Sequence, residues 1–267
     1  MASLKVPGCV LHYEVHGIGE PLVLVHGTGT DSSTWDPVVD LLAADARVIV
    51  YDRRGYGRST HPPVRDYRIH TNDLHALLEE VCDRPAHVVG WSSGGNVSMA
   101  LAAKDTSRMR SLCVVEPAFH GLRLGDPAVL AVTTRVKWQQ VRGRRAEAGE
   151  EFFRFVYALR SGGNAYDLAD ERVRDGMRRN VEPVIAEFDL HPFGVAVEHV
   201  ATRAVAAARV PMTWVLGDQS PRWLHRIHAR FARHRSDLRT VVIPNVGHLA
   251  HDQDPLAFTE AVRPPAQ

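Results

Sequence analysis

The sequence contains little that would indicate a secreted, membrane-bound or nucleic-acid-binding protein. Only three of its 267 residues are cysteines, and Cys9, Cys82 and Cys113 form neither a disulfide framework nor a C-x-x-C metal-binding pair. No apolar run approaches the roughly 20 residues that a helix needs to span a bilayer. The net charge of +1 gives no electrostatic reason to expect a nucleic acid or an anionic membrane as a partner.

The first residues also lack the apolar core of a signal peptide. Because the cysteines show no disulfide pattern either, we expect a cytoplasmic protein. A hydrophobic content of 45% and a length of 267 residues are sufficient for one large globular domain. The partner that we expect is a small-molecule substrate, with no nucleic acid and no membrane, and the sequence leaves the oligomeric state open.

Short apolar runs alternate with helical patterns along most of the chain, and residues 10–16 alternate like an edge strand. Continuous apolar runs are typical of central strands that are covered on both faces. The alternation therefore predicts an α/β fold with a mainly parallel, doubly wound sheet. The predicted buried strands are residues 21–25, 48–51, 86–89, 112–115, 212–216 and 239–243.

The alternation stops in the middle of the chain. Residues 118–208 contain helical patterns but no clear buried strand, and glycine and proline pairs separate these patterns. We therefore expect a core domain formed by residues 1–117 and 209–267, with residues 118–208 inserted as a helical lid or cap.

The most informative motif is the pentapeptide GWSSG at residues 90–94, between a predicted strand and a helix rich in small residues. Glycines in a strand–turn–helix motif of this kind allow the helix to approach the strand closely, and they leave the central serine exposed at the tip. Ser92 is therefore a candidate nucleophile for attack on a carbonyl carbon.

Several other reactive side chains also follow predicted strands directly. Glu116, Asp218 and His248 each come at or just after the end of one, as does the loop that begins at His26. Ligand sites in parallel sheets form at the carboxyl ends of the strands. The sequence therefore predicts a single active site at this edge of the sheet.

These motifs together resemble the α/β-hydrolase superfamily, and the resemblance extends over residues 10–262. It implies a fold of the α/β-hydrolase type with a helical lid, but it carries little information on the substrate. The matching segments are HGTG at 26–29, DRRGYGRS at 52–59, GWSSGG at 90–95, and GHLAH at 247–251 before DP at 254–255.

The resemblance also implies roles for single residues. Ser92 would be the nucleophile and His248 its base, because a serine hydroxyl attacks well only when a base removes its proton. The backbone N–H groups of Thr28 and Ser93 would form the oxyanion hole. No metal or cofactor is implied, since this chemistry is complete without one.

The catalytic acid departs from the common pattern. The family usually has an aspartate three residues after the glycine that ends the seventh core strand, and here that residue is Ser220. Glu116 is the carboxylate that we favour, because a carboxylate directly after a buried apolar run needs a partner, which His248 would supply. Asp218 is the alternative acid, and a site without an acid is the third possibility.

A serine nucleophile favours hydrolysis of a carboxylic ester, thioester or lactone of a small to medium apolar substrate through an acyl-enzyme. The alternatives are a non-hydrolytic lyase or cyclase that uses the same pocket, and a ligand-binding protein with a vestigial triad. Aromatic side chains are expected to line an apolar pocket. The candidates are Trp91, Phe119, Phe152, Phe155 and Tyr157.

Overall fold

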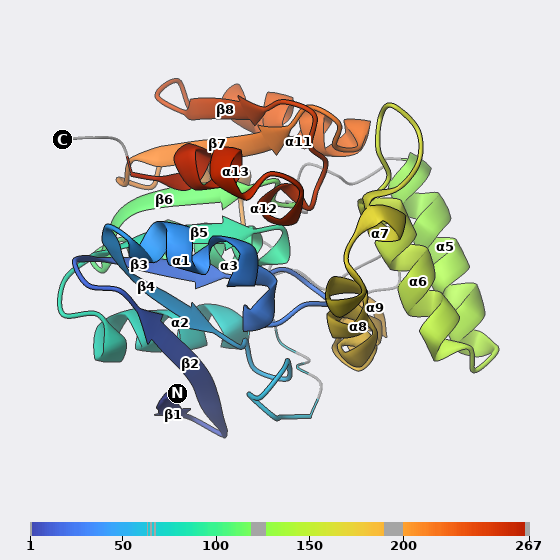
Figure 1. Cartoon of the computed structure of the whole chain (residues 1–267), viewed down its shortest axis with the longest axis horizontal. Helices are drawn as coiled ribbons and strands as arrows, with labels where there is room; N and C mark the ends of the chain where they lie inside the picture. Colours follow the sequence, from blue (N-terminus) through green and yellow to red (C-terminus); the bar gives the residue numbers. More distant parts are fainter. Residues whose placement is uncertain are drawn as a thin grey trace.

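An eight-stranded sheet forms the centre of the molecule, in the order β1-β2-β4-β3-β5-β6-β7-β8 (Figure 1). The computed structural model describes residues 2–62, 64, 66, 68–118, 127–189 and 200–264. For residues 187–189 it describes the backbone but not the side chains. The predicted α/β class with a mainly parallel sheet is confirmed. The strands are β1 (Ala2–Val6), β2 (Cys9–His16), β3 (Glu20–Val25), β4 (Ala46–Tyr51), β5 (Ala86–Trp91), β6 (Met109–Val115), β7 (Met212–Gly217) and β8 (Arg239–Ile243).

The N-terminal strand β1 is not predicted by the apolar pattern. It pairs antiparallel with β2, so β2 is an inner strand and not the edge strand that its alternation suggested. Most of β1 is exposed, which explains the weak apolar signal. The turn between the two strands contains Gly8 at φ 75°, in the left-handed region that glycine enters without strain.

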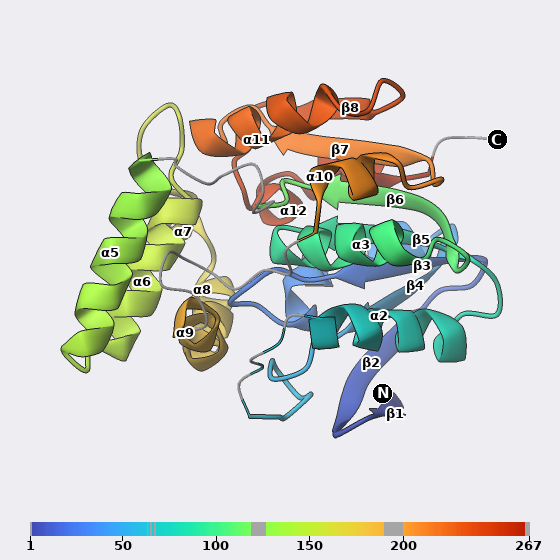
Figure 2. The same cartoon turned by 180° about the vertical axis from the view of Figure 1, so that it is seen from behind.

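Helices cover both faces of the sheet (Figures 1 and 2). On one face lie α1 (Asp36–Ala43), α12 (Ala250–Gln253) and α13 (Pro255–Val262). On the other lie α2 (Arg68–Val81), α3 (Ser93–Lys104), α10 (Thr202–Ala206) and α11 (Arg222–Ala232). The 3-10 turn η1 (Ser32–Trp35) directly precedes α1. None of the helices in these described ranges is long and apolar enough to span a membrane.

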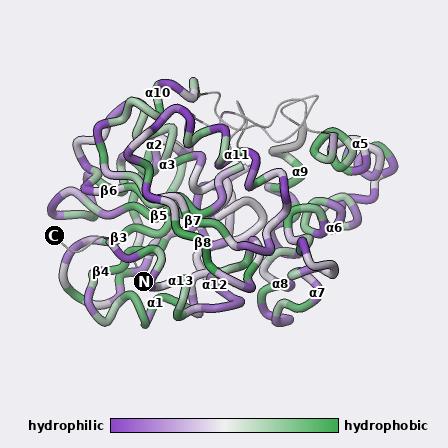
Figure 3. The backbone as a smooth tube through the Cα atoms, turned by 90° about the horizontal axis from the view of Figure 1, so that it is seen from above, coloured by the Kyte–Doolittle hydropathy of each residue, from purple (hydrophilic) through white to green (hydrophobic). Residues whose placement is uncertain are grey.

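The parallel strands at the centre of the sheet form the core. All side chains of β5 are buried, and so are those of β3 after its first residue. Hydrophobic segments accordingly gather at the central strands in Figure 3, while hydrophilic segments lie towards the outside. This burial on both faces is the physical reason that the central strands are continuous apolar runs.

Of the described helices between β6 and β7, all except α10 lie beyond the sheet, at the ends of the parallel strands (Figures 1 and 2). We call them the helical insertion. They fall within the predicted boundaries 118–208, and the division into two domains stays a prediction. The helices are α5 (Pro127–Val141), α6 (Arg145–Val156), α7 (Ala165–Leu168), α8 (Glu171–Arg179) and α9 (Val181–Asp189).

The turn between β5 and α3 is packed too closely for side chains at its glycines. A Cβ added to Gly90 would lie 2.6 Å from the carbonyl oxygen of Gly94, and one added to Gly94 would lie 2.5 Å from that of His26. The first turn of α3 therefore sits directly against the end of β3, as the sequence motif predicts.

We predict that Gly94→Ala lowers the free energy of unfolding by about 3 kcal/mol, because the new methyl group would overlap two backbone carbonyls that cannot move independently. Urea denaturation followed by circular dichroism measures the change.

Gly176→Ala is the matched control, since Gly176 is also helical and a Cβ there would meet only the end of the Arg179 side chain, at 3.7 Å. It should leave stability unchanged or raise it by up to about 1 kcal/mol. Equal effects of the two substitutions would contradict the close packing.

Candidate active site

Ser92 and Glu116 follow neighbouring strands and share an unusual backbone conformation. Ser92 comes directly after β5 and has φ 53°, and Glu116 comes directly after β6 and has φ 48°. Residues other than glycine rarely adopt this left-handed region of φ, so surrounding contacts must hold both turns in this conformation. The Ser92 N–H donates to the Val115 carbonyl and the Glu116 N–H to that of Val215, which fixes each turn to the next strand.

A buried hydrogen bond joins Glu116 to His248. Glu116 Oε2 lies 2.6 Å from His248 Nδ1, and both side chains are at most 2% exposed. The second oxygen, Oε1, accepts the Gly217 N–H at 2.7 Å. A carboxylate beside Nδ1 favours the tautomer that has its proton there, which leaves Nε2 as a base.

The other candidate acid lies elsewhere. Asp218 Oδ1 accepts from Gln219 Nε2 at 3.1 Å, and within the described residues Asp218 forms no bond with His248. Ser220, which occupies the usual acid position, is fully buried, and its hydroxyl has no hydrogen-bond partner in the described part of the chain. Of the two predicted carboxylates, the structure thus brings only Glu116 to His248.

Trp91, the last residue of β5, connects this strand to the loop that contains His248. Its indole Nε1 donates to the His248 carbonyl at 2.9 Å, and the two rings lie 5.4 Å apart. Ser92 itself is half-buried. Its Cβ lies close to the loop after β3, which we call the oxyanion loop after its predicted role, and is 3.1 Å from where a Cβ of Gly27 would be. Because Trp91 is almost fully buried, its best-defined role is to hold His248 in register with Ser92, and the predicted substrate contact stays a prediction.

The two residues predicted for the oxyanion hole lie in contact. The Thr28 hydroxyl donates to Ser93 Oγ at 2.7 Å, which joins the loop after β3 to the start of α3. Arg53 is completely buried behind them, and its Nη2 donates to Ser93 Oγ at 3.2 Å and to the Gly27 carbonyl at 3.1 Å. Sequence reasoning did not identify Arg53, because nothing local shows that its side chain turns inward.

The His26 side chain braces this loop through contacts with Arg53 and Gly27. Its Nε2 accepts the Arg53 N–H at 2.9 Å, and its Nδ1 lies 2.8 Å from the Gly27 carbonyl. Burial, followed by the charge of Arg53, lowers the pKa of His26 to about 3, so the ring is neutral at physiological pH. This agrees with a bracing role for His26. Asp52 and Arg54 also have structural contacts, to Ser32 and Asp73 respectively.

A second buried histidine lies under Trp91. The rings of His251 and Trp91 are 4.5 Å apart, and His251 Nε2 lies 3.0 Å from the Thr34 hydroxyl. Burial, followed by the charge of His248, lowers the pKa of His251 to about 3. A neutral His251 therefore packs against Trp91, which in turn is bonded to His248.

Some aromatic side chains of the segment between β6 and β7 lie beside this site, and others pack elsewhere. The Tyr157 ring lies 5.7 Å from that of His248, and Phe153 packs directly against Gly29 of the oxyanion loop. Phe152 packs beside Phe153, with 5.6 Å between their rings. Phe155 stacks on Trp223 of α11, and Phe119 lies outside the described residues.

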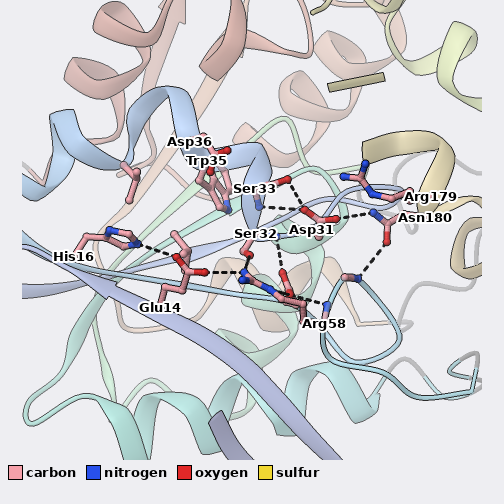
Figure 4. Close-up of a pocket in the computed structure, with 14 residues that line it drawn as sticks. Glu14, His16, Asp31, Ser32, Ser33, Trp35, Asp36, Arg58, Arg179 and Asn180 are labelled. Carbon is pink, nitrogen blue, oxygen red and sulfur yellow. Dashed lines mark hydrogen bonds and ion pairs between the residues drawn. The ribbon is translucent and has the colours of Figure 1, made fainter. Parts of the chain in front are cut away.

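A separate polar cavity of about 560 Å³ lies between the core and the insertion (Figure 4). It is lined by four carboxylates but by no member of the pair Glu116–His248 nor by Ser92. Asn180, between α8 and α9, spans its wall, where its Nδ2 donates to Asp31 at 2.9 Å and its Oδ1 accepts the Gly57 N–H. In the described ranges, no three His, Cys, Asp or Glu side chains are arranged to hold a metal. The four carboxylates belong to Glu14, Asp31, Asp36 and Asp52.

Comparisons with known proteins agree with this geometry. Residues 22–261 match the model of the Alpha/beta hydrolase family. The chain is 36% identical over 127 residues to the uncharacterized hydrolase YraK of Bacillus subtilis, which covers 46% of this chain and 47% of that protein. It is 38% identical to the putative carbamate hydrolase RutD of Azorhizobium caulinodans, over 39% of this chain and 40% of that protein. These matches span less than half of each relative.

Among solved structures, the bromoperoxidase of Bacillus anthracis superimposes with a TM-score of 0.80. The superposition covers 98% of this chain and 97% of the other, at 23% sequence identity. At this identity the similarity establishes a common fold along the whole chain.

We predict that the free energy of unfolding decreases as the pH falls from about 6.5 towards 3, with about 1.4 kcal/mol per pH unit from each of His26 and His251. The unfolded chain binds protons at these histidines below about pH 6.5, whereas the folded chain does not until about pH 3, so acid favours unfolding. Urea denaturation over this pH range measures the slope.

His251→Gln should make the slope shallower, because one proton uptake is removed. His234→Gln, at an exposed position, is the control and should leave the slope as it is in the wild type. An unchanged slope in His251→Gln would show that this ring does not couple folding to protonation.

Proposed function

Because the chain belongs to the alpha/beta hydrolase family, we propose that it hydrolyses a carboxylic ester, thioester or lactone through an acyl-enzyme on Ser92. The observation that carries the proposal is the buried 2.6 Å hydrogen bond between Glu116 and His248. Burying these two groups costs free energy that the pair must offset, and a binding protein would have no reason to maintain such a pair near Ser92.

In the proposed acylation step, His248 Nε2 accepts the hydroxyl proton as Ser92 Oγ forms a bond to the substrate carbonyl carbon. The C=O π electrons move to the oxygen, which accepts hydrogen bonds from the N–H groups of Thr28 and Ser93. Glu116 stabilises the imidazolium through Nδ1–H. The tetrahedral intermediate then collapses, and the leaving oxygen or sulfur takes the proton from His248.

Deacylation repeats these steps with water as the nucleophile. His248 Nε2 accepts a proton from water as the water oxygen bonds to the acyl carbon, and returns it to Ser92 Oγ when the acid leaves. The buried charge of Arg53, bonded to Ser93 and the Gly27 carbonyl, adds a fixed positive potential behind the oxyanion loop.

We further propose that the helical insertion acts as the lid of this site. The contact of Phe153 with Gly29 and the position of Tyr157 beside His248 support this role. A covering layer excludes water from the charges that develop during reaction, which strengthens the interactions between them.

We predict that Ser92→Ala abolishes both hydrolysis of p-nitrophenyl esters and covalent labelling by a fluorophosphonate. The first is measured by release of p-nitrophenol, and the second by mass spectrometry of the intact chain. Serine-based acylation requires both signals in the wild type and neither in the variant.

Labelling of the wild type without ester turnover would favour a lyase or cyclase that uses the same pocket. Absence of both signals in a folded wild type would favour a ligand-binding protein with a vestigial triad. Ser107→Ala is a suitable control, because Ser107 is remote in sequence from the motif and lies on the surface.

We predict that Glu116→Gln lowers kcat by about 10⁴-fold, because the neutral amide neither stabilises the imidazolium nor fixes the required tautomer. Asp218→Asn should change kcat by less than about threefold, since Asp218 contacts a glutamine and not His248. Steady-state kinetics with one p-nitrophenyl ester compares the two variants. The reverse order of effects would assign the acid to Asp218.

A further inference from the structure

A groove of about 600 Å³ separates the helical insertion from α11. We call it the arginine groove. Its walls come from α5 and α6, from the loop that follows α6, and from the first turns of α11. In Figures 1 and 2, the beginning of α11 approaches the insertion near this loop. The two sides are joined where the Arg160 N–H donates to the Gln219 carbonyl at 2.8 Å.

The lining of the groove is strongly basic for a chain whose net charge is only +1. Five arginines line it against one carboxylate, Glu151, which forms an ion pair with Arg135 at 3.0 Å. Arg154 is paired with carboxylates outside the groove. The arginines are Arg135, Arg154, Arg160, Arg222 and Arg226.

Two of these arginines lack a carboxylate partner. Arg160 donates to the backbone carbonyl of Asp218 at 3.2 Å, and neither Arg160 nor Arg222 forms an ion pair with any described residue. They come from opposite walls of the groove. A bound anion would therefore be held between guanidinium groups that are not already neutralised, and guanidinium groups bind carboxylates with favourable planar geometry.

The beginning of α11 adds further donors on the same side. This helix has no acidic residue in its first turn, and Pro221 caps it without a side-chain hydrogen bond. The positive end of the helix dipole thus lies at the wall of the groove, with Arg222 beside it. Trp223 also lines the groove, is 5% exposed, and has an indole N–H without a hydrogen-bond partner in the described part of the chain.

The groove adjoins the catalytic loop. Leu159 lines it and also packs against Gly247, where an added Cβ would lie 2.5 Å from the leucine side chain. Gly247 directly precedes His248, and Tyr157, two residues before Leu159, lies beside the His248 ring. The segment that contains Tyr157 and Leu159 therefore lies between the groove and the His248 ring.

We propose that the arginine groove binds a carboxylate at the far end of the substrate, so that the preferred ester or thioester has an acyl chain ending in an anionic group. This inference rests on the proposed function. The cavity on the other side of the insertion has four carboxylates in its lining against two arginines, Arg58 and Arg179, so the charge pattern favours binding of the same group in the arginine groove.

The test compares two p-nitrophenyl esters that differ only at the far end of the acyl chain. One is the mono-p-nitrophenyl ester of a dicarboxylic acid, and the other has a terminal carboxamide in place of the free carboxylate. Adipic, suberic and sebacic derivatives cover a range of lengths. We expect the wild type to show a kcat/KM about tenfold or more higher for the carboxylate at the best length, mainly through KM, and a smaller preference at high ionic strength.

Arg160→Gln combined with Arg222→Gln should reduce this ratio to near one. Arg144→Gln combined with Arg233→Gln is the matched control. Both residues are exposed and lie outside the groove: Arg144 precedes α6, and Arg233 follows α11. The control removes the same total charge and should keep the preference for the carboxylate. Equal kcat/KM for both esters in the wild type, or a preference that survives in the Arg160→Gln, Arg222→Gln variant, would overturn the proposal.

A binding measurement separates this inference from the proposed function. Calorimetric titration of suberate into Ser92→Ala is expected to give binding that the additional Arg160→Gln and Arg222→Gln substitutions weaken about tenfold or more. This result would support the groove even if no ester were hydrolysed. Binding of inorganic phosphate without binding of any dicarboxylate would overturn the assignment to a carboxylate.

Discussion

The close contact between the first turn of α3 and the end of β3 is the constraint on which the site depends. Gly94 lies against the backbone carbonyls of Val25 and His26, and no side chain fits between them. This contact places Ser93 beside Thr28, where the two hydroxyls meet at 2.7 Å. It also leaves the enclosed space behind them that Arg53 fills. A wider crossing would separate the nucleophile from the loop that is proposed to stabilise its oxyanion.

The sequence was sufficient to predict those parts of the site that depend on local backbone geometry. The glycines around Ser92 encode a tight turn, and the apolar run before Glu116 places a carboxylate at a strand end where it needs a partner. The acid that pairs with His248 was a choice between Glu116, Asp218 and no acid, because the segments that carry these residues meet only in the folded chain. Strand β1 was missed because its side chains are mostly exposed and give little apolar signal.

Other features depend on contacts between segments far apart in the chain, and no local pattern encodes them. The Phe155 ring stacks on Trp223 because of where the insertion lies, and its predicted contact with the substrate stays a prediction. Asn180 bonds to Asp31 and Gly57 because the junction of α8 and α9 rests on the core. The net charge of +1 likewise conceals an uneven distribution, since carboxylates outnumber arginines in the cavity on one side of the insertion and arginines outnumber carboxylates in the groove on the other.

The contact between Gly29 and Phe153 makes the residues allowed in one segment depend on those in a distant segment. The aromatic ring occupies the volume where a side chain at position 29 would begin, so a larger residue there requires a smaller one at position 153. Gly29 also has φ 81°, which further restricts its replacement. An insertion taken from another protein would therefore need a residue at position 153 that leaves room for the loop after β3, or that loop would have to be exchanged with it.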